Sequence, residues 1–457
     1  MSKEIAKRFI DFVNQTGSPY HSVAACKSVL KAAGFTPLSE KASHWPIIPG
    51  GKYYITRDHS EIFAFVVGER VNLKSDSSGL VMIGAHTDSP CLMMRPHSAQ
   101  GREKHLQLGV ATYGGGLWHT WFDRGLGMAG KIVYRTESGG LGEKLVRIAR
   151  PICIVPNLAI HLLSNEERKA FDVNPENHLM PVIATSKRVK DDQINGHHKA
   201  IMSLLAKEAN IDNEDRISDL TICLMDAQPA EFVGIDEEFI STGRIDNQLS
   251  TWAAIDALAS GDLSEHDICI AAAFNHEEVG SNSATGADSN TAVSWINKII
   301  KSLDDTNDVQ SIMSRSVLVS ADCAHAIHPN YATKHQSEHK VYMQSGLVFK
   351  ANPNQRYSTT SVTSAMAREI CKRENVQVQD FVVRNDSPCG STIGPMLSAI
   401  LGVRSIDIGA PQWAMHSCRE TCGVDDVANI RNACNAFYKH WRAVDSSHQS
   451  VDEEAIH

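Results

Sequence analysis

The sequence lacks the features that would tie the protein to a membrane or to nucleic acid. No run of about 18 or more apolar residues occurs, so no transmembrane helix is expected. The first residues lack the apolar core of a signal peptide, which predicts a cytoplasmic protein. The net charge is -9 and basic residues do not cluster, so neither nucleic acid nor an anionic membrane surface is an expected partner. A chain of 457 residues with 42% hydrophobic and 21% charged residues is typical of a soluble globular protein with two or three domains.

Several common chemical motifs are also missing or incomplete. No serine lies in a Gly-x-Ser-x-Gly turn, which argues against a serine hydrolase of that type. The glycine run at residues 114–116 lacks the Lys-Ser/Thr pair that a nucleotide phosphate loop needs. Cys418 and Cys422 are spaced four apart, but no second cysteine pair completes a structural zinc site. The eleven cysteines are spread along the chain, and without a secretion signal we expect free thiols.

Apolar periodicity predicts an α/β fold that is interrupted by an insertion. Helix-type spacing near the start gives way to short apolar strands, and the same alternation returns after residue 240. Between these parts the chain shows strand-like runs without regular intervening helices, which predicts a β-rich module. We therefore expect one mixed-sheet domain formed by residues 1–94 and 241–457, with an inserted module at residues 95–240.

Two stretches of the expected insertion are expected to have a structural role and not a chemical one. The charged segment 186–199 is expected to be a loop. The apolar cluster of Trp118, Trp121 and Phe122 is more typical of a core or an interface than of a ligand-binding site.

The stretch at residues 268–281 carries the clearest chemical signal. It begins as an apolar run that predicts a buried strand, and it then changes abruptly to polar residues that include Glu277 and Glu278. Two adjacent carboxylates at the end of a buried strand repel each other and are costly to desolvate. A solvated strand end is one interpretation. The other is a catalytic site in which one carboxylate is a base and its neighbour holds a metal.

Ligand-type side chains follow other predicted strands in the same way. His86 and Asp88 come directly after an apolar run, and Asp322 follows another. His416 lies beyond a fourth strand. Asp246 precedes a predicted helix, where it could also be an ordinary N-cap. In an open α/β sheet the carboxyl ends of the strands share one edge, so these groups are expected to converge there.

A convergent set of two histidines and three carboxylates has a specific chemical meaning. Such ligands suit two zinc ions, with one carboxylate bridging them. Paired metal ions can activate a water molecule and polarise a carbonyl oxygen at the same time. Each motif alone is weak, but the ordered set indicates a dizinc aminopeptidase.

The sequence resembles the aspartyl aminopeptidase family over nearly its whole length. Two departures from the family pattern are Asn275, where Asp is expected, and Cys323, where Met is expected. Neither is expected to be a metal ligand. The matching stretches are Gly84-Ala-His-Thr-Asp-Ser-Pro90, His276-Glu-Glu-Val-Gly-Ser281, Ser320-Ala-Asp-Cys-Ala-His-Ala-Ile-His-Pro-Asn-Tyr331, Arg384-Asn-Asp-Ser-Pro-Cys-Gly-Ser-Thr-Ile-Gly-Pro395, Met415-His-Ser417, Tyr113-Gly-Gly-Gly-Leu-Trp118 and Trp121-Phe-Asp-Arg124.

The resemblance implies a role for each candidate in the metal centre. One zinc ion would be held by His86 and Asp322, and the other by Glu278 and His416. Asp246 would bridge the two ions.

The same resemblance distinguishes the two glutamates, which spacing alone leaves open. Glu277 would be the general base that takes a proton from the zinc-bridging water. Asp88 would orient His86 through the second ring nitrogen.

Selection of an acidic N-terminal residue calls for a fixed cation. Lys350 lies in a strand-like run where a lone lysine is unusual, although it could equally be a gatekeeper on an edge strand. The family's acid pocket resembles a pairing of Lys350 with Tyr357. His161 best matches a histidine that reaches the site from a neighbouring subunit, and a core histidine is the alternative. His325 follows a candidate ligand and is expected to line the pocket.

The resemblance thus implies a mixed-sheet α/β/α metallopeptidase domain with an inserted β-rich dimerisation domain. The enzyme would release N-terminal aspartate and glutamate from peptides, with two Zn²⁺ per subunit, in a dodecamer built from dimers. Two rival functions are an aminopeptidase that prefers neutral residues and a catalytically idle scaffold. The intact set of metal-type residues argues against the scaffold.

Overall fold

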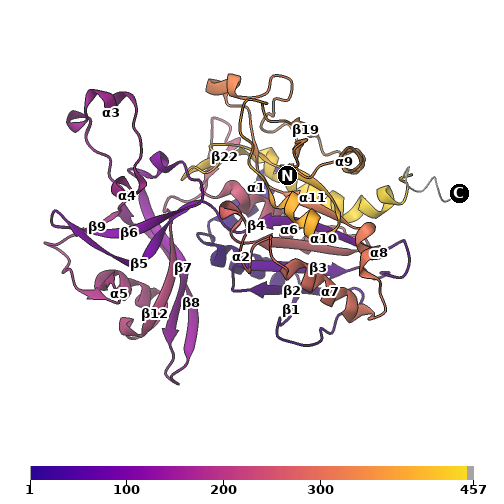
Figure 1. The fold of residues 1–457 in the computed structure, drawn as a ribbon, viewed down its shortest axis with the longest axis horizontal. Coiled ribbons are helices and arrows are strands. Elements are labelled where there is room, and N and C mark those ends of the chain that lie inside the picture. The colour runs from indigo at the N-terminus through magenta and orange to yellow at the C-terminus, as the bar shows by residue number, and fades with distance from the viewer. Residues whose placement is uncertain (1, 450–457) are drawn as a thin grey trace.

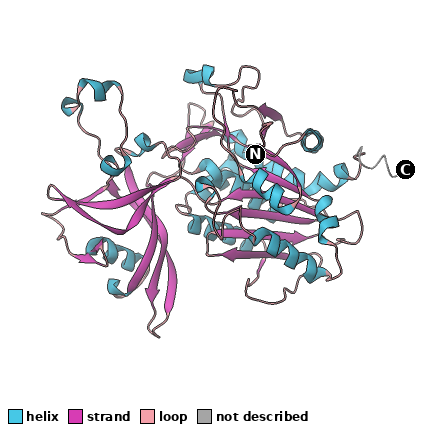
Figure 2. Ribbon diagram, viewed as in Figure 1, coloured by secondary structure: helices cyan, strands magenta, loops and turns pink. Residues whose placement is uncertain are grey.

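The computed structural model describes residues 2–449 and has the expected α/β class with a β-rich part beside it (Figures 1 and 2). The outer ends of the first and last expected segments, residue 1 and residues 450–457, lie outside the described residues. Within the described part, no helix is both long and apolar enough to cross a membrane.

The larger part is built on a nine-stranded mixed sheet. Its centre is parallel, because β15 pairs in parallel with β4, and β4 with β16. In spatial order the strands are β1 (Thr36–Pro37), β2 (Lys52–Arg57), β3 (Glu61–Val67), β15 (Ile268–Phe274), β4 (Leu80–His86), β16 (Val317–Ala321), β20 (Arg404–Gly409), β18 (Leu347–Lys350) and β19 (Val378–Phe381).

Helices cover both faces of this sheet. Successive residues of β15 alternate between two apolar cores, since Ile268 and Ile270 face one and Cys269 and Ala271 face the other. Both faces are therefore buried, as a sheet with a parallel centre requires. One core includes α1 (Ser2–Val13), α2 (Pro19–Ala32), α6 (Ile245–Ser260), α9 (Ser361–Arg373) and α11 (Val424–Asp445); the other includes α7 (Thr291–Leu303), α8 (Val309–Ser314) and α10 (Ile393–Leu401).

The second part is a closed six-stranded barrel at the left of Figure 1. Trp121 and Phe122 are buried in its core, in agreement with the core interpretation of that cluster. Its strands in spatial order are β12 (Ile217–Asp226), β5 (Cys91–Arg102), β6 (His105–Tyr113), β9 (Val182–Thr185), β8 (Leu141–Ile154) and β7 (Gly125–Arg135).

The barrel also holds structure that the sequence pattern did not predict. Helix α5 (Lys199–Glu208) packs Ile201, Met202 and Leu205 into the barrel core. The segment expected to be a loop contains a short hairpin of β10 (Gln193–Ile194) and β11 (His197–His198). Most of the segment is turn or loop as expected, and the hairpin and α5 are additions that the sequence pattern did not indicate.

A third, five-stranded sheet connects the two parts. Its strands carry the loop of His416, which lies between β21 and β22. In spatial order they are β13 (Glu231–Val233), β14 (Phe239–Thr242), β22 (Glu420–Gly423), β21 (Pro411–Trp413) and β17 (Ala324–His325).

The barrel carries a protruding segment between β8 and β9. It forms a loop at the upper left of Figure 1, with α3 (Asn165–Lys169) at its far end and α4 (Pro175–His178) nearer the barrel. We call residues 156–174 the arm.

Candidate metal centre

Three neighbouring strands end at the same place and deliver four of the candidate residues. His86 is the last residue of β4, and its backbone is in register with Phe274 at the end of β15. Glu277 and Glu278 follow β15 in a short 3-10 helix, Glu277–Val279. Asp322 follows β16 directly. The sheet therefore brings together at one edge side chains that are distant in sequence.

Asp246 lies between the two histidines of the site. One of its carboxylate oxygens, Oδ1, is 3.4 Å from His86 Nε2, and the other, Oδ2, is 3.5 Å from His416 Nε2. The N-cap position of α6 belongs to Arg244, so the N-cap interpretation of Asp246 is wrong. A carboxylate that presents one oxygen to each of two imidazoles has the geometry of a bridging ligand.

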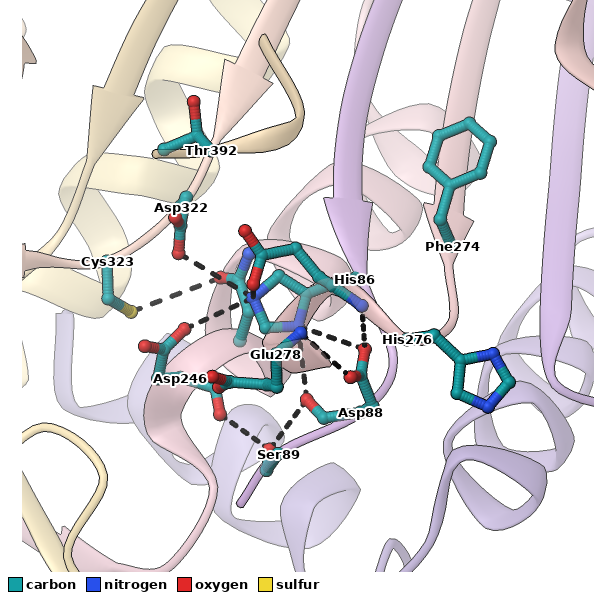
Figure 3. Close-up of polar contacts among 12 residues, drawn as sticks. His86, Asp88, Ser89, Asp246, Phe274, His276, Glu278, Asp322, Cys323 and Thr392 are labelled. Carbon is teal, nitrogen blue, oxygen red and sulfur yellow. Dashed lines mark hydrogen bonds and ion pairs between the residues drawn. The ribbon is translucent and has the colours of Figure 1, made fainter. Parts of the chain in front are cut away.

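Two clusters of potential ligand atoms share this carboxylate. One is His86, Asp246 and Asp322, and in Figure 3 these side chains turn toward one another. His86 Nε2 is 3.7 Å from Asp322 Oδ1.

The second cluster is Asp246, Glu278 and His416, in which His416 Nε2 is 3.2 Å from Glu278 Oε2. A further group joins His86 with Glu277 and Glu278, so Glu277 lies beside the centre. The adjacent His276 points away (Figure 3), and its Nδ1 contacts Ser283 Oγ at 2.8 Å.

The surrounding carboxylates raise the pKa values of both histidines of the site. Burial opposes the charge of His416, yet Asp246 and Glu278 outweigh it and raise its pKa to about 10. Burial likewise opposes the charge of His86, but contacts with three carboxylates, Asp246 first, raise its pKa well above the usual range. A divalent cation at this place would supply the positive charge that these carboxylates favour.

The carboxylates divide into two kinds. Burial would raise the pKa of Asp246, but its contacts with the two imidazoles lower the pKa below the usual range. Burial raises the pKa of Glu278 well above its usual range, and the carboxylate of Asp246 adds to the effect. Burial also raises the pKa of Glu277 to about 8, against the opposing charge of His86.

Within residues 2–449, the buried oxygens Asp246 Oδ1 and Glu278 Oε1 accept no hydrogen bond, although His86 Nε2 lies 3.4 Å from the first. A buried carboxylate oxygen without a donor is costly unless it binds a cation. Zinc binds the nitrogen of a neutral imidazole and the oxygen of an ionised carboxylate. The residues present therefore fit zinc.

Asp88 is in contact with His86, but its carboxylate is not the nearest partner. His86 Nδ1 is 3.1 Å from the backbone oxygen of Asp88 and 3.5 Å from its Oδ1. The carboxylate accepts hydrogen bonds from the backbone N–H groups of Glu277 and Glu278, each at 3.1 Å. It therefore also fixes the segment that carries both glutamates.

The barrel contributes contacts that the sequence pattern did not indicate. The Tyr113 hydroxyl donates to Asp88 Oδ2 at 2.6 Å. The backbone oxygen of Gly115 lies 2.9 Å from His416 Nδ1, which leaves Nε2 facing the cluster. Both residues lie in a stretch that resembles the family, but residue spacing gives no partner for either, since Gly115 acts through its backbone and the partner of Tyr113 is distant in sequence.

A cavity of about 440 Å³ opens onto the cluster. Lys350, Tyr357 and His325 line it together with the candidate ligands. Among the lining residues within the described part of the chain, Lys350 is the one lysine or arginine. His325 lines this cavity, and its role toward a substrate stays a prediction.

Lys350 lies in the interior of the sheet, because β18 runs between β20 and β19. Its side chain is buried, so the edge-strand alternative is wrong. Its Nζ donates to the backbone oxygen of Cys323 at 3.1 Å and lies 3.5 Å from Asp322 Oδ2. The ammonium also lies 5.1 Å from the centre of the Tyr357 ring.

The charge of Lys350 is maintained despite its burial. Burial lowers the pKa of this group, but the carboxylates of Asp322 and Asp407 outweigh it and raise the pKa. The raised pKa favours a positive charge on Lys350 beside the candidate ligands.

His161 is not part of this cavity. It belongs to a short 3-10 helix of the arm, Ile160–Leu162, and it is exposed. The alternative of a core histidine is therefore wrong, and the structure of one chain does not bring His161 to the site.

Known proteins match the chain closely. Residues 12–438 match the family model described as aminopeptidase I zinc metalloprotease (M18). The aspartyl aminopeptidase of Caenorhabditis elegans is 40% identical over 467 residues, which covers 98% of this chain and 97% of the relative.

Two solved structures share the fold over nearly the whole chain. The "Cryo-EM structure of the Ape4 and Nbr1 complex" gives a TM-score of 0.94 with 36% identity, and covers 99% of this chain and 89% of that chain. The "Structure of S. cerevesiae mApe1 dodecamer" gives 0.85 with 27% identity, and covers 97% and 98% respectively. The chain belongs to the aminopeptidase I (M18) family of zinc metalloproteases and is a metalloaminopeptidase.

Proposed function

We propose that this metalloaminopeptidase releases N-terminal aspartate and glutamate from peptides. The observation that carries the proposal is Lys350, a buried cation in the same cavity as Glu277 and the metal cluster. An acidic side chain in this cavity can pair with the ammonium, whereas an apolar side chain would leave it without a new partner. The name of the C. elegans relative supports the same substrate class.

The metal centre is proposed to hold two zinc ions per subunit. His86 and Asp322 would bind one ion, Glu278 and His416 the other, and Asp246 both. The two clusters that share Asp246 support this arrangement, as do the unpartnered oxygens of Asp246 and Glu278. Zinc, when bound, supplies Lewis acidity for the peptide carbonyl and makes water more acidic.

Glu277 is proposed to be the proton carrier. Its carboxylate lies beside the cluster, with Oε2 3.9 Å from His86 Nε2. Its backbone N–H donates to Asp88, which restricts where the side chain can be placed. Glu277 can accept a proton from the attacking water and pass it to the departing amine nitrogen, so one group serves both halves of the reaction. Asp88 would hold the His86 ring and this backbone in place.

The side-chain pocket is proposed to consist of Lys350, Tyr357 and His325. Lys350 would pair with the side-chain carboxylate of the substrate. Tyr357 would hold the Lys350 ammonium in place through its aromatic ring. His325 would line the opening.

The decisive experiment compares matched peptides that begin with Asp, Glu, Leu or Ala. We expect rapid release of Asp and Glu, loss of release after metal stripping and recovery on addition of zinc. Lys350→Met should lower kcat/KM for acidic peptides by about 10–100-fold, the effect of losing a charged hydrogen bond. Lys340→Met, at an exposed lysine outside the cavity, is the matched control. Release of Leu or Ala alone, or unchanged Asp release in Lys350→Met, would contradict the proposal.

We also propose that residues 95–240 form a dimerisation module inserted between residues 1–94 and 241–457, and that dimers build a dodecamer. The apolar arm supports an interface there, since Leu158, Ile160 and Leu162 are 55%, 60% and 70% exposed. His161, on the same arm, would then reach the cavity of a neighbouring subunit. The mApe1 dodecamer supports the size of the assembly. The cysteines, which form no disulfide, suit the reducing cytoplasm, where we place the protein.

A further inference from the structure

Glu420 lies directly behind the metal cluster and has no role in the reaction described above. It is the first residue of β22, four positions after His416. The residue is only 2% exposed. A fully buried carboxylate is costly unless donors satisfy it, so its contacts need an explanation.

The two oxygens of Glu420 hold two different segments of the centre. Oε1 accepts a hydrogen bond from the backbone N–H of His416 at 2.7 Å. Oε2 accepts one from the backbone N–H of Asp246 at 2.9 Å. The two donors belong to the start of α6 and to the loop before β22, which are far apart in sequence. The Glu420 carboxylate therefore joins the backbone of Asp246, the candidate bridging ligand, to the backbone of His416.

Both of these segments need an anchor. His416 has a φ of 67°, and Arg244, two residues before Asp246, has a φ of 65°. Left-handed backbone at residues other than glycine costs free energy and persists only where surrounding contacts impose it. The short hydrogen bonds from Glu420 supply such contacts at both segments.

Glu420 does not belong to any of the metal-binding clusters found among residues 2–449. Each of its oxygens already accepts a backbone hydrogen bond. Its action on the centre is therefore indirect, through the residues that it holds.

We propose that Glu420 is a positioning residue that sets the separation between Asp246 and His416, a role that presupposes the zinc ligands proposed above. His416 Nε2 and Asp246 Oδ2 are 3.5 Å apart, and a metal ion shared by these atoms tolerates only small displacements. Because Glu420 holds both backbones, it keeps the side chains of Asp246 and His416 at a constant separation. Outer partners of this kind typically contribute about 10–100-fold to metal affinity or activity.

The substitution Glu420→Gln tests this role with little change in shape. The amide keeps one acceptor oxygen, but its NH₂ group faces the other backbone N–H and cannot accept from it. We expect kcat to fall by about 10–100-fold, while KM for the peptide changes by less than about threefold. Zinc content after dialysis should fall toward one ion per chain, and the visible spectrum of the cobalt-substituted protein should change.

Asp426 offers a matched control. It is buried and accepts hydrogen bonds from the backbone N–H groups of Gln344 and Gly423, but it lies away from the metal-binding clusters. Asp426→Asn should lower thermal stability and leave kcat, zinc content and the cobalt spectrum unchanged. Equal losses of kcat and zinc in both variants would show a general effect of stability and overturn the proposal.

Two further variants separate the possible failures. Glu420→Asp keeps the carboxyl group but is too short to reach both amides, so it should show the same losses if Glu420→Gln does not fold. Unchanged zinc content and kcat in whichever variant folds would overturn the positioning role. His416→Ala tests the ligand set itself: zinc loss there with none in the Glu420 variants removes only this inference, whereas retained zinc in His416→Ala removes the proposed ligands and the inference with them.

Discussion

The nine-stranded sheet and the barrel contribute to the metal centre in different ways. Every candidate ligand among residues 2–449 ends or follows a strand, or lies at the start of a helix, in the sheet part or its connecting sheet. The barrel gives the hydroxyl of Tyr113 and the backbone oxygen of Gly115, which contact residues of the centre from outside. The sheet thus supplies the candidate ligand atoms, and the barrel supplies contacts to His416 and Asp88 beside them.

The largest expected effect lies on the sheet side of this comparison. Glu277→Gln should lower kcat by about 10²–10⁴-fold, because the amide cannot accept the proton while the ligands are unchanged. Zinc content, measured by mass spectrometry of metals, and the size of the assembly should remain those of the unmodified protein. Turnover within about threefold of the unmodified enzyme would remove Glu277 from the mechanism.

A smaller effect from the barrel would sharpen the comparison. Tyr113→Phe removes the hydrogen bond to Asp88 Oδ2 and keeps the ring. We expect about a tenfold loss of kcat, as for other groups that hold metal ligands in place from behind.

The control for this variant is Tyr134→Phe, which removes a hydroxyl from the same barrel on β7. Its ring lies against Lys144 and Arg216, away from the metal-binding clusters. If the two variants have equal kcat, the Tyr113 hydroxyl does not affect the reaction. The barrel would then serve only the assembly of subunits.

The smallest effect on a single subunit should come from the arm. Leu162→Ser exchanges a 70% exposed side chain, so the unfolding free energy of one subunit should change by less than about 0.5 kcal/mol. The mass of the assembly in light scattering should nevertheless decrease, because the exposed leucine would be part of the interface. Lys169→Ser, at an exposed polar residue of the same arm, is the control and should leave the mass unchanged. An unchanged mass in Leu162→Ser would place the dimer interface elsewhere.

The difference between the two regions also explains what the sequence could predict. Polar residues that interrupt apolar runs, such as His86 and Glu278, indicate the ends of buried strands, and the sheet brings such ends together. The fold class and the β-rich part were therefore predictable. The burial of Lys350 was not, because the sequence does not reveal which strand lies at the edge of a sheet.

Contacts that use backbone atoms were beyond the reach of sequence patterns. Gly115 contributes a carbonyl oxygen, and Glu420 binds two N–H groups that any residue would offer. Such contacts depend on how distant segments pack, and they leave no residue type or spacing to recognise. Helix α5 is a different case, since Ile201, Met202 and Leu205 carried a helical pattern that neighbouring charges obscured.

The order of the sheet has a consequence for the protein as it leaves the ribosome. Strand β4 is made early, but both of its partners, β15 and β16, are translated only after the entire barrel. Until then its apolar edges have no native neighbour, a condition that favours association with other chains or capture by chaperones. His416 is translated later still. A chain that ends before His416 therefore lacks one of the residues proposed above to hold zinc.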